Sequence, residues 1–353
     1  MSFGLASAAY DMKKAFITGV GGQDGAYLAR ALLLRGYEVW GTTRYPVRQP
    51  SEPLVRLGIA NQVKLLPVDF TSIPSLACAV GAAHPDEVYN LAAQSSVAAS
   101  FVEPTDTGEV TALGVARLLQ ALREVNPQAR FYQASSSEMF GMVRETPQVE
   151  TTAFYPRSPY GAAKVYAHWM TVNYRESYDM FACSGILFNH ESPLRPERFV
   201  TRKICQAVAR IKLGQQSELT LGNLDVVRDW GFAGDYVEAM IAMLQQDTPE
   251  DYIIATGETH SLREFVAGAF ECQGLNYEDY VHIDPAFFRP AEVNLVVGDS
   301  TKARTQLKWK PRIDFPQLIA FLMDAEMRRA RDEEHLVEYF PAGFLESIAP
   351  QTI

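Results

Sequence analysis

The sequence is 353 residues long, with 47% hydrophobic residues, 21% charged residues and a net charge of −10. These values are ordinary for a globular protein, and the length suffices for one large α/β unit with a second lobe. The negative charge and the absence of a Lys/Arg-rich stripe exclude nucleic-acid binding. The longest apolar runs fall short of 18 residues, which excludes a transmembrane helix and a membrane partner.

The cysteines and the N-terminus indicate the compartment. Cys78, Cys183, Cys205 and Cys272 are far apart, form no CxxC pair and lie in apolar runs. We therefore expect buried free thiols, neither disulfides nor a metal site, in a reducing compartment. The first residues lack a charged segment before an apolar one, so residues 1–12 are predicted to be a flexible leader and the protein cytoplasmic.

Apolar strand patterns and amphipathic helix patterns alternate along the first half of the chain. Strands are predicted at 14–19, 37–43, 63–69, 87–93, 130–137 and 183–189, and helices at 26–36, 107–125 and 160–177. This alternation predicts an α/β fold, a doubly wound parallel sheet with helices on both faces. Beyond residue 190 the pattern is less regular, which predicts a smaller α/β lobe over the carboxyl edge of the sheet, where ligands bind in such folds.

A glycine-rich turn joins the first strand to the first helix. In I-T-G-V-G-G-Q-D-G the glycines Gly19, Gly22 and Gly25 have the spacing G-x-x-G-x-x-G. Glycines let the backbone approach a pyrophosphate, and the helix N-terminus offers free N–H groups to the anion. The turn therefore predicts a bound dinucleotide, and we assign residues 13–190, with some later segments, to a cofactor domain. Residues 191–340 would mainly bind substrate, and 341–353 would be a tail.

The ends of later strands refine the cofactor. After the second strand the sequence reads G-T-T-R-Y-P-V-R-Q, with no acid to hold a ribose hydroxyl, and Arg44 stands where a 2′-phosphate would lie. This favours NADP, with NAD left open. Asp69, after the third strand, is placed to meet the adenine amino group. Ala92 and Ala93, after the fourth strand, are small enough to let the cofactor pass.

A tyrosine and a lysine four residues apart suggest proton transfer. Tyr160 and Lys164 lie in P-Y-G-A-A-K on a predicted helix, and Q-A-S-S-S-E ends the strand before it. Tyr10 and Lys14 share the spacing, but Tyr10 falls in the leader without a rigid support. In the first pair Lys164 would lower the pKa of Tyr160 by its charge, Tyr160 would exchange a proton with a substrate hydroxyl, and Ser136 would bond the same oxygen.

These residues resemble the extended short-chain dehydrogenase/reductase family, which has a Rossmann-type fold. Further segments resemble its GDP-mannose 4,6-dehydratase branch, in order from residue 14 to about 313: N-L-A-A-Q-S, Q-A-S-S-S-E-M-F-G, F-Y-P-R-S-P-Y-G-A-A-K, G-I-L-F-N-H-E-S-P, F-V-T-R-K-I, L-G-N-L-D-x-x-R-D-W-G and R-P-A-E-V. The resemblance implies a lyase of deoxysugar biosynthesis. Tyr160 would deprotonate the C4 hydroxyl of GDP-mannose during hydride transfer, and Glu138 would remove the C5 proton as water leaves from C6.

Glu138 distinguishes a 4,6-dehydratase from a 4-epimerase or a reductase, since neither of these needs a base at C5. Two alternatives stay open: a 4,6-dehydratase, epimerase or decarboxylase of another nucleotide-sugar, and a cofactor-binding regulatory module without activity. Serine stands at position 136 where the family usually has threonine. It keeps the hydroxyl, so we expect function to be retained.

The resemblance also implies binding residues. For the cofactor, in addition to those above, it implies Gln23, Asp24, Phe70, Leu91, Tyr160, Lys164, Leu187, Asn189, His190 and Arg195. For the nucleotide-sugar it implies Ser95, Glu138, Asn189, Val200, Lys203, Leu221, Arg228, Arg289 and Glu292. Local cations suit a diphosphate on an acidic chain. The family's loop after the second strand, with paired arginines, reaches a neighbouring subunit in tetramers; here Tyr45 and three prolines replace that pattern. A homodimer is expected through the helices at 107–125 and 160–177, and a tetramer is left open.

Overall fold

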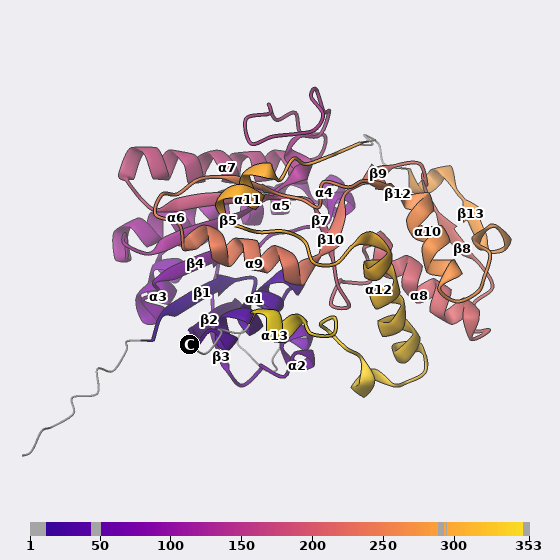
Figure 1. The fold of residues 1–353 in the computed structure, drawn as a ribbon. Helices are drawn as coiled ribbons and strands as arrows, with labels where there is room; N and C mark the ends of the chain where they lie inside the picture. Colours follow the sequence, from indigo (N-terminus) through magenta and orange to yellow (C-terminus); the bar gives the residue numbers. More distant parts are fainter. Residues whose placement is uncertain (1–11, 44–50, 289–292, 294, 349–353) are drawn as a thin grey trace, which may run out of the picture.

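A computed structural model of the chain shows a large sheet domain and a smaller lobe at one end of it (Figure 1). The structure describes residues 12–43, 51–288, 293 and 295–348. Within these residues, no helix has the length and apolar content needed to cross a membrane.

The large domain is built on a seven-stranded parallel sheet with strand order β11-β6-β5-β4-β1-β2-β3. In sequence order its strands are β1 (Lys14–Thr18), β2 (Glu38–Thr43), β3 (Val63–Pro67), β4 (Glu87–Asn90), β5 (Arg130–Ser136), β6 (Ala182–Leu187) and β11 (Tyr252–Ile254). The order reverses direction between β1 and β4, so the carboxyl ends of these two strands form the crevice in which doubly wound folds bind ligands. The predicted strands and their parallel arrangement are confirmed.

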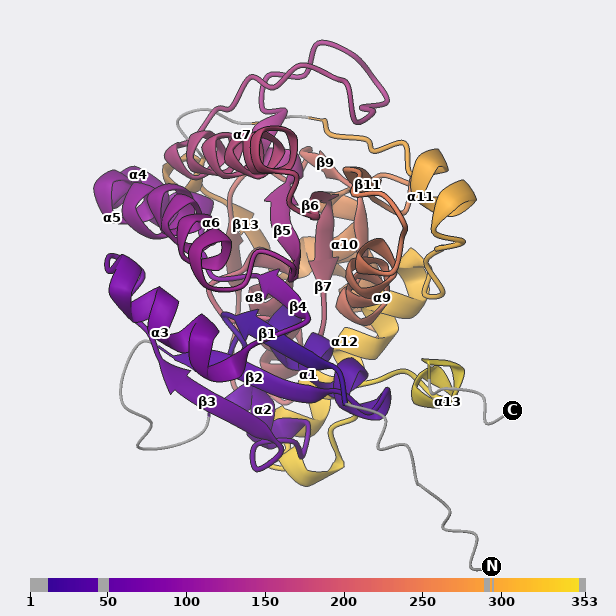
Figure 2. The same cartoon turned by 90° about the vertical axis from the view of Figure 1, so that its left-hand side faces the viewer.

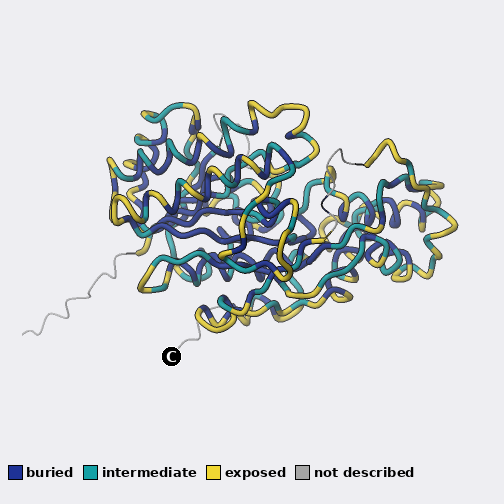
Figure 3. The backbone as a smooth tube through the Cα atoms, turned by 90° about the horizontal axis from the view of Figure 1, so that it is seen from above, coloured by how far each residue is buried: buried dark blue, intermediate teal, exposed yellow. Residues whose placement is uncertain are grey.

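Helices cover both faces of this sheet, as Figure 2 shows. One face carries α3 (Ile73–Ala83), α6 (Gly114–Val125) and α7 (Pro159–Tyr178), and the other carries α1 (Gln23–Leu34) and α9 (Ala233–Leu244). The inner strands between them are almost wholly buried (Figure 3). Strands covered on both faces are mainly apolar, and buried polar side chains among them find partners, as Asn90 does with Gln133 (2.8 Å).

The helix expected at 107–125 is interrupted. The chain forms α4 (Val97–Val102), α5 (Pro104–Gly108), a π-helical turn η1 (Glu109–Leu113) and then α6. One threonine before this turn and one within it contact the loop after β4: Thr107 of α5 accepts from the side chain of Gln94 (3.2 Å), and Thr111 of η1 accepts from its backbone N–H (3.1 Å). A π-helical turn of this kind is a local distortion that regular periodicity does not reveal.

The prediction that all four cysteines are buried is wrong for two of them. All four are free, but only Cys183 and Cys205 are buried, whereas Cys78 and Cys272 are exposed. Cys78 lies on the outer face of α3, and Cys272 follows the last turn of its helix, so an apolar neighbourhood in sequence does not place either side chain in the core.

The smaller lobe begins after β6, and the chain returns from it to the sheet domain. Its elements are β7 (Asn189–Glu191), α8 (Val200–Lys212), β8 (Leu219–Leu221), β9 (Val227–Arg228), β10 (Trp230–Phe232), β12 (His260–Ser261), α10 (Leu262–Glu271), β13 (Val281–Ile283) and α12 (Phe315–Ala330). They form the strand pairs β7–β10, β9–β12 and β8–β13. Between them, α9 and β11 pack back on the sheet domain. The remaining short elements are α2 (Glu52–Arg56), η2 (Ser137–Met139), η3 (Tyr277–Asp279), η4 (Pro285–Phe287), α11 (Thr301–Gln306), η5 (Glu334–Leu336) and α13 (Phe344–Ile348).

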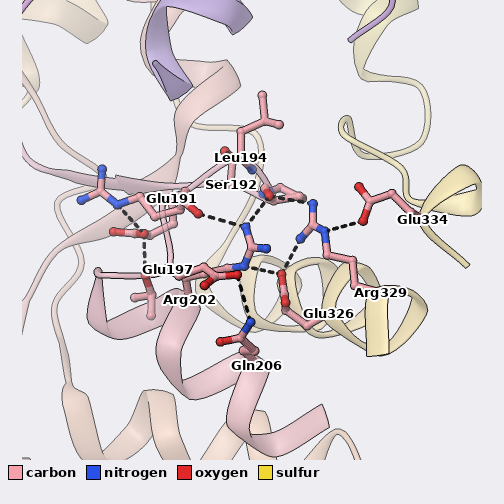
Figure 4. Close-up of polar contacts among 12 residues, drawn as sticks. Glu191, Ser192, Leu194, Glu197, Arg202, Gln206, Glu326, Arg329 and Glu334 are labelled. Atoms are coloured by element: carbon pink, nitrogen blue, oxygen red, sulfur yellow. Dashed lines mark hydrogen bonds and ion pairs between the residues drawn. The ribbon is translucent and has the colours of Figure 1, made fainter. Parts of the chain in front are cut away.

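An ionic cluster joins α8 to α12 and to the C-terminal segment (Figure 4). Arg202 on α8 contacts Glu326 on α12 (Nε–Oε1, 2.5 Å), and Arg329 contacts the same carboxylate. Arg329 also reaches Glu334 (3.1 Å), which in turn contacts Arg56 on α2 (3.3 Å). We call these residues the α8–α12 cluster. Its alternating charges connect the smaller lobe to the outer helices of the sheet domain.

Candidate active site

The glycine turn has the close packing that its sequence predicts. Gly19 has a left-handed φ of +70°, and a Cβ there would lie 2.9 Å from the backbone nitrogen of Ala92. A Cβ on Gly25 would lie 2.4 Å from the carbonyl oxygen of Gly19. Only glycine fits at either position, so α1 begins directly against the ends of β1 and β4, with its N-terminal N–H groups at the crevice.

Thr18 ties the two strands of the crevice together, and sequence reasoning missed it. Its hydroxyl donates to the side-chain oxygen of Asn90 (2.6 Å) and accepts from the backbone N–H groups of Leu91 and Ala92 (both 3.1 Å). A hydroxyl residue as the last position of the strand before the glycine turn is the signal that could have found it. The predicted cofactor residues Leu91, Ala92 and Ala93 follow directly and are half-buried.

The two residues predicted after β3 differ in environment. Asp69 is exposed, and its Oδ1 accepts from the hydroxyl and backbone N–H of Thr71 (2.7 and 2.8 Å), which lowers the pKa of Asp69. Phe70 is buried in the core beside Gly114, whose Cβ position would be 3.1 Å from the ring. The phenyl ring therefore packs the interior, and only Asp69 presents its side chain at the surface.

Ser136 and Glu138 follow one another at the carboxyl end of β5. Ser136 caps the short helix η2, accepting a hydrogen bond from the backbone N–H of Glu138 (3.2 Å). Both side chains are partly exposed, whereas the flanking Ser135, Ser137 and Met139 are buried. The turn therefore presents a hydroxyl and a carboxylate together at the edge of the sheet.

Tyr160 and Lys164 are brought to the same edge by the start of α7. Ser158 caps the helix through the N–H of Gly161 (3.0 Å), and Pro159 occupies its first turn. A Cβ on Gly161 would lie 2.7 Å from the carbonyl oxygen of Glu138, so this glycine allows α7 to start against η2. The phenol of Tyr160 consequently lies near Ser136, whose side chain acts to lower the pKa of the phenol.

The pKa of Tyr160 is raised in the structure, whereas the sequence predicts that Lys164 lowers it. Burial raises the pKa of Tyr160 to about 12, opposed by the hydrogen bond from Ser136 and the charge of Arg195. The ammonium of Lys164 lies 5.7 Å from the centre of the Tyr160 ring and donates to the carbonyl of Ala134 (2.6 Å). Burial lowers the pKa of Lys164 to about 8. Desolvation, not the attraction between the two groups, dominates both shifts.

The segment after β6 crosses the first turn of α1. Leu187 is buried, Asn189 is half-buried in β7 opposite Trp230, and His190 contacts Asp24 (2.9 Å). Gln23 donates to the carbonyl of His190 (3.2 Å) and accepts from Ser192 (2.9 Å). Arg195 lies against Phe199 and contacts Glu191. The predicted cofactor residues from α1 and from 187–195 are thus brought into contact.

Several of the predicted substrate residues lie in the smaller lobe. Val200 is exposed at the start of α8, Lys203 donates to the carbonyl of Thr220 (2.9 Å), and Leu221 is buried in β8. Arg228 is buried in β9, and Ser95 is exposed in the loop after β4. Arg44, Arg289 and Glu292 lie outside the described residues.

Two further features of this lobe were not found from the sequence. Phe287 is 57% exposed and lies under the ammonium of Lys203, 5.0 Å from its ring centre. Asp229, next to Arg228, is buried and accepts from the backbone N–H groups of Thr256 and Gly257 (3.0 and 2.8 Å). Asp229 thereby fixes the strand that carries Arg228. A buried acid within R-D-W was the available signal for this role.

The catalytic edge, as we call Ser136, Glu138, Tyr160 and Lys164 together, carries side chains suited to acid–base chemistry. A hydroxyl pair, a nearby carboxylate and a lysine suit proton transfers on a sugar, next to a crevice that fits a dinucleotide. The described residues contain no group of three or more His, Cys, Asp or Glu side chains that could hold a metal ion.

Comparison with known proteins defines the class. The fold resembles UDP-glucose 4-epimerase from Thermus thermophilus in complex with NAD, with a TM-score of 0.76, 27% identity, and coverage of 89% of this chain and 98% of that one. It also resembles RMD from Pseudomonas aeruginosa complexed with NADPH, with a TM-score of 0.73, 24% identity, and coverage of 90% and 100%. The fold is that of a Rossmann-type enzyme of the extended short-chain dehydrogenase/reductase class.

The sequence comparisons identify the family within this class. The profile of the family described as GDP-mannose 4,6 dehydratase matches residues 16–322. GDP-mannose 4,6 dehydratase 2 from Arabidopsis thaliana is 50% identical over 345 residues, which cover 95% of this chain and 91% of the relative. The chain belongs to the GDP-mannose 4,6-dehydratase family, as its motifs predict.

Proposed function

We propose that this enzyme is a hydro-lyase that converts GDP-D-mannose to GDP-4-keto-6-deoxy-D-mannose by removing water. Its nicotinamide cofactor would be regenerated within each catalytic cycle. Besides the family, the observation that carries this proposal is the position of Glu138. Its carboxylate lies two residues after Ser136, close enough for its charge to raise the pKa of Tyr160. A third group that can accept a proton at this place is what dehydration requires and 4-epimerisation does not.

The catalytic residues divide the proton transfers of the proposed mechanism between them. Tyr160 takes the proton of the sugar's C4 hydroxyl, and Ser136 hydrogen-bonds the same oxygen. Oxidation at C4 makes the C5 proton acidic, so Glu138 removes it and protonates the hydroxyl that leaves C6 as water. A nicotinamide held at the glycine turn would supply the redox chemistry, taking up a hydride from C4 and giving it back at C6. As the hydride returns, Tyr160 gives C5 the proton that it took from the C4 hydroxyl, so the product differs from the substrate by one water.

Lys164 supports the proton exchange of Tyr160. With its pKa lowered to about 8, it gains and loses a proton near neutral pH more readily than an exposed lysine. Its charge also favours the phenolate when that forms. We therefore assign Lys164 to positioning and proton supply on the face of α7 that carries Tyr160.

The residues of the crevice fit a dinucleotide. The glycine contacts at Gly19 and Gly25 leave the N-terminal amides of α1 beside the ends of β1 and β4, where a pyrophosphate would be held. Asp69 would meet the adenine, and Leu91 to Ala93 would line the passage. We propose NADP as the cofactor, supported by Arg44 in the sequence, with NAD as the alternative.

The substrate's nucleotide would bind on the smaller lobe. Lys203 and Arg228 supply positive charge from α8 and β9, and Asn189, Val200, Leu221 and Ser95 line the approach between lobe and sheet. Arg289 and Glu292 complete the proposed set from the sequence. A diphosphate needs such local cations because the chain as a whole is acidic, with a net charge of −10.

We also propose a cytoplasmic homodimer. Exposed apolar and aromatic side chains gather on α4 and α7, two helices that pack together: Phe101, Val102, Tyr166 and Trp169. A cluster of this kind on neighbouring helices is typical of a protein–protein interface. Sedimentation analysis of Trp169→Glu tests it, with dissociation to monomer as the expected result.

The proposed activity is tested with a panel of substrates. The purified protein, with NADP or NAD, is given GDP-mannose, UDP-glucose, UDP-glucuronate and dTDP-glucose, and the products are identified by mass spectrometry and NMR. We expect loss of one water from GDP-mannose without net cofactor reduction. Conversion of a different sugar alone would replace the substrate and keep the mechanism, and binding of cofactor without any conversion would indicate a regulatory module.

Glu138→Gln separates dehydration from oxidation. The variant should lose product formation by at least about a hundredfold, because no base remains for C5, while still oxidising C4 and so accumulating absorbance of reduced cofactor. Glu145→Gln, an exposed glutamate on the following loop, is the matched control and should keep full activity. Normal product formation by Glu138→Gln would contradict the assignment.

A further inference from the structure

His190 is held so that both of its ring nitrogens face acceptors. Its Nδ1 lies 2.7 Å from the carbonyl oxygen of Phe188, and its Nε2 lies 2.9 Å from Oδ2 of Asp24. A carbonyl oxygen and a carboxylate can only accept, so each ring nitrogen must carry a hydrogen. The geometry therefore requires the doubly protonated, positively charged imidazolium.

The surroundings of His190 preserve this charge. The ring stacks on Tyr236 of α9, with ring centres 4.6 Å apart, and the nearby charge of Arg195 acts to lower the pKa of His190. Burial opposes the charged ring, but Asp24 raises the pKa of His190 above its ordinary value. Burial likewise opposes the carboxylate, yet the charge and hydrogen bond of His190 lower the pKa of Asp24 to about 2. The two groups form an ion pair, which we call the Asp24–His190 pair.

The position of Asp24 makes this pair relevant to cofactor binding. Asp24 lies in the first turn of α1, the helix whose N-terminal amides and dipole are to hold the doubly charged pyrophosphate. An uncompensated carboxylate in that turn would repel the pyrophosphate and cancel much of the helix dipole. Its charge also reaches the catalytic edge, where it raises the pKa values of Tyr160 and Lys164.

We propose that His190 acts on the cofactor indirectly, as the counter-cation that neutralises Asp24 and thereby lets the N-terminus of α1 accept a pyrophosphate. Arg195 is not equivalent, because its guanidinium is engaged by Glu191 (3.1 Å) and packs on Phe199. His190 is thus a positioning and charge-compensating residue, and its backbone carbonyl, held by Gln23, keeps the crossing segment against α1. This inference rests on the proposed dinucleotide site.

The inference is tested by measuring NADPH binding, without sugar, by the fluorescence of the dinucleotide. His190→Gln should weaken binding by at least about tenfold, because a buried charge left without its partner acts at full strength. Asp24→Asn should bind at least as tightly as the native protein. The double variant Asp24→Asn/His190→Gln should recover most of the affinity, since the repelling charge is gone.

The pH dependence gives a second readout. The native affinity should fall as pH rises through the raised pKa of His190, because the neutral ring leaves Asp24 uncompensated. This fall in affinity with pH should be absent in Asp24→Asn. Subtracting the pH profile of the variant from that of the native protein removes the contribution of Lys164, which both proteins share. Adenosine 2′-monophosphate, which has no pyrophosphate, should bind all variants alike.

Asp235→Asn is the matched control. Asp235, like Asp24, is a carboxylate in the first turn of a helix, here α9, and it is buried. Its substitution should leave the affinity for NADPH unchanged. The inference is overturned by native affinity in His190→Gln, by a double variant no better than His190→Gln, or by Asp24→Asn weakening binding as much as His190→Gln does. A protein that binds neither NADPH nor NADH overturns the dinucleotide site itself, whereas failure to convert GDP-mannose leaves the inference standing. Thermal unfolding of each free variant shows whether the fold is intact.

Discussion

Lys164 and Arg202 are both buried cations, and their surroundings differ in one decisive respect. Lys164, at the catalytic edge, donates to the neutral carbonyl of Ala134 (2.6 Å), and burial lowers its pKa to about 8. Arg202, in the α8–α12 cluster, contacts the carboxylate of Glu326 (2.5 Å) and the carbonyls of Pro193 and Arg195 (3.0 and 2.9 Å).

We propose that this difference separates a site for proton transfer from a contact that holds two helices together. A buried lysine with a neutral hydrogen-bond partner holds its proton weakly, so it can exchange protons near neutral pH. A buried arginine paired with a carboxylate stays charged at all working pH values and fixes two helices in one arrangement. Substitutions at the catalytic edge should therefore change the rate of the reaction, whereas substitutions in the α8–α12 cluster should change the free energy of unfolding.

The largest effect is expected at the catalytic edge. Tyr160→Phe removes the proton-exchanging hydroxyl and keeps the ring, so turnover of GDP-mannose should fall by about a hundred- to ten-thousandfold while the thermal unfolding temperature changes little. Tyr178→Phe, at an exposed position of the same helix outside the proposed dimer interface, is the control and should keep its activity. Steady-state kinetics measure the effect, and activity above a tenth of the native value would show that Tyr160 does not transfer the proton.

Glu326→Gln should show the opposite pattern. The variant leaves Arg202 and Arg329 buried without their carboxylate, which should lower the free energy of unfolding by about 3–5 kcal/mol. Turnover per folded molecule should remain close to native, because Glu326 lies outside the catalytic edge. Urea denaturation and kinetics at low temperature measure the two quantities.

A control for this variant lies close by on the same helix. Arg328 pairs with Asp324 on the exposed side of α12 (2.7 Å), and Arg328→Gln should leave the urea midpoint unchanged, since exposed ion pairs are screened by water. If the urea midpoint of Glu326→Gln is also unchanged, the α8–α12 cluster does not stabilise the fold.

Local sequence patterns predicted the parts of this comparison that depend on neighbours in the chain. The strands, the glycine turn, and the set of Ser136, Glu138, Tyr160 and Lys164 each lie within short segments whose periodicity or spacing carries the information. The start of α7 follows from Ser158 and Pro159 in the same way. Strand ends meet at one edge of a parallel sheet, so the grouping of these residues was predictable too.

The rest depends on tertiary contacts that no local pattern contains. Asp24 and His190 are 166 residues apart, and nothing in either segment indicates that they pair. The raised pKa of Tyr160 follows chiefly from its burial, which the spacing of a tyrosine and a lysine does not reveal. The exposure of Cys78 depends on which face of α3 meets the sheet, and an apolar run leaves that face undefined.

The smallest predicted effect concerns the pH dependence of stability and tests the role of Lys164 directly. The pKa of Lys164 is about 8 in the folded protein and 10.5 in the unfolded chain. Below pH 8 both states bind the proton, and the folded state carries the full cost of the buried charge. Between pH 8 and 10.5 the unfolded chain binds more protons than the folded one, so this cost disappears as pH rises.

Lys164→Met removes the titrating group and fills a similar volume. The variant's advantage in free energy of unfolding over the native protein should therefore be greatest below pH 8 and shrink by about 2 kcal/mol towards pH 10. Taking the difference cancels the buried tyrosines and cysteines common to both proteins. Lys212→Met, an exposed lysine that also donates to one backbone carbonyl, should show no such change. A difference independent of pH would mean that Lys164 keeps an ordinary pKa and that the contrast with Arg202 fails.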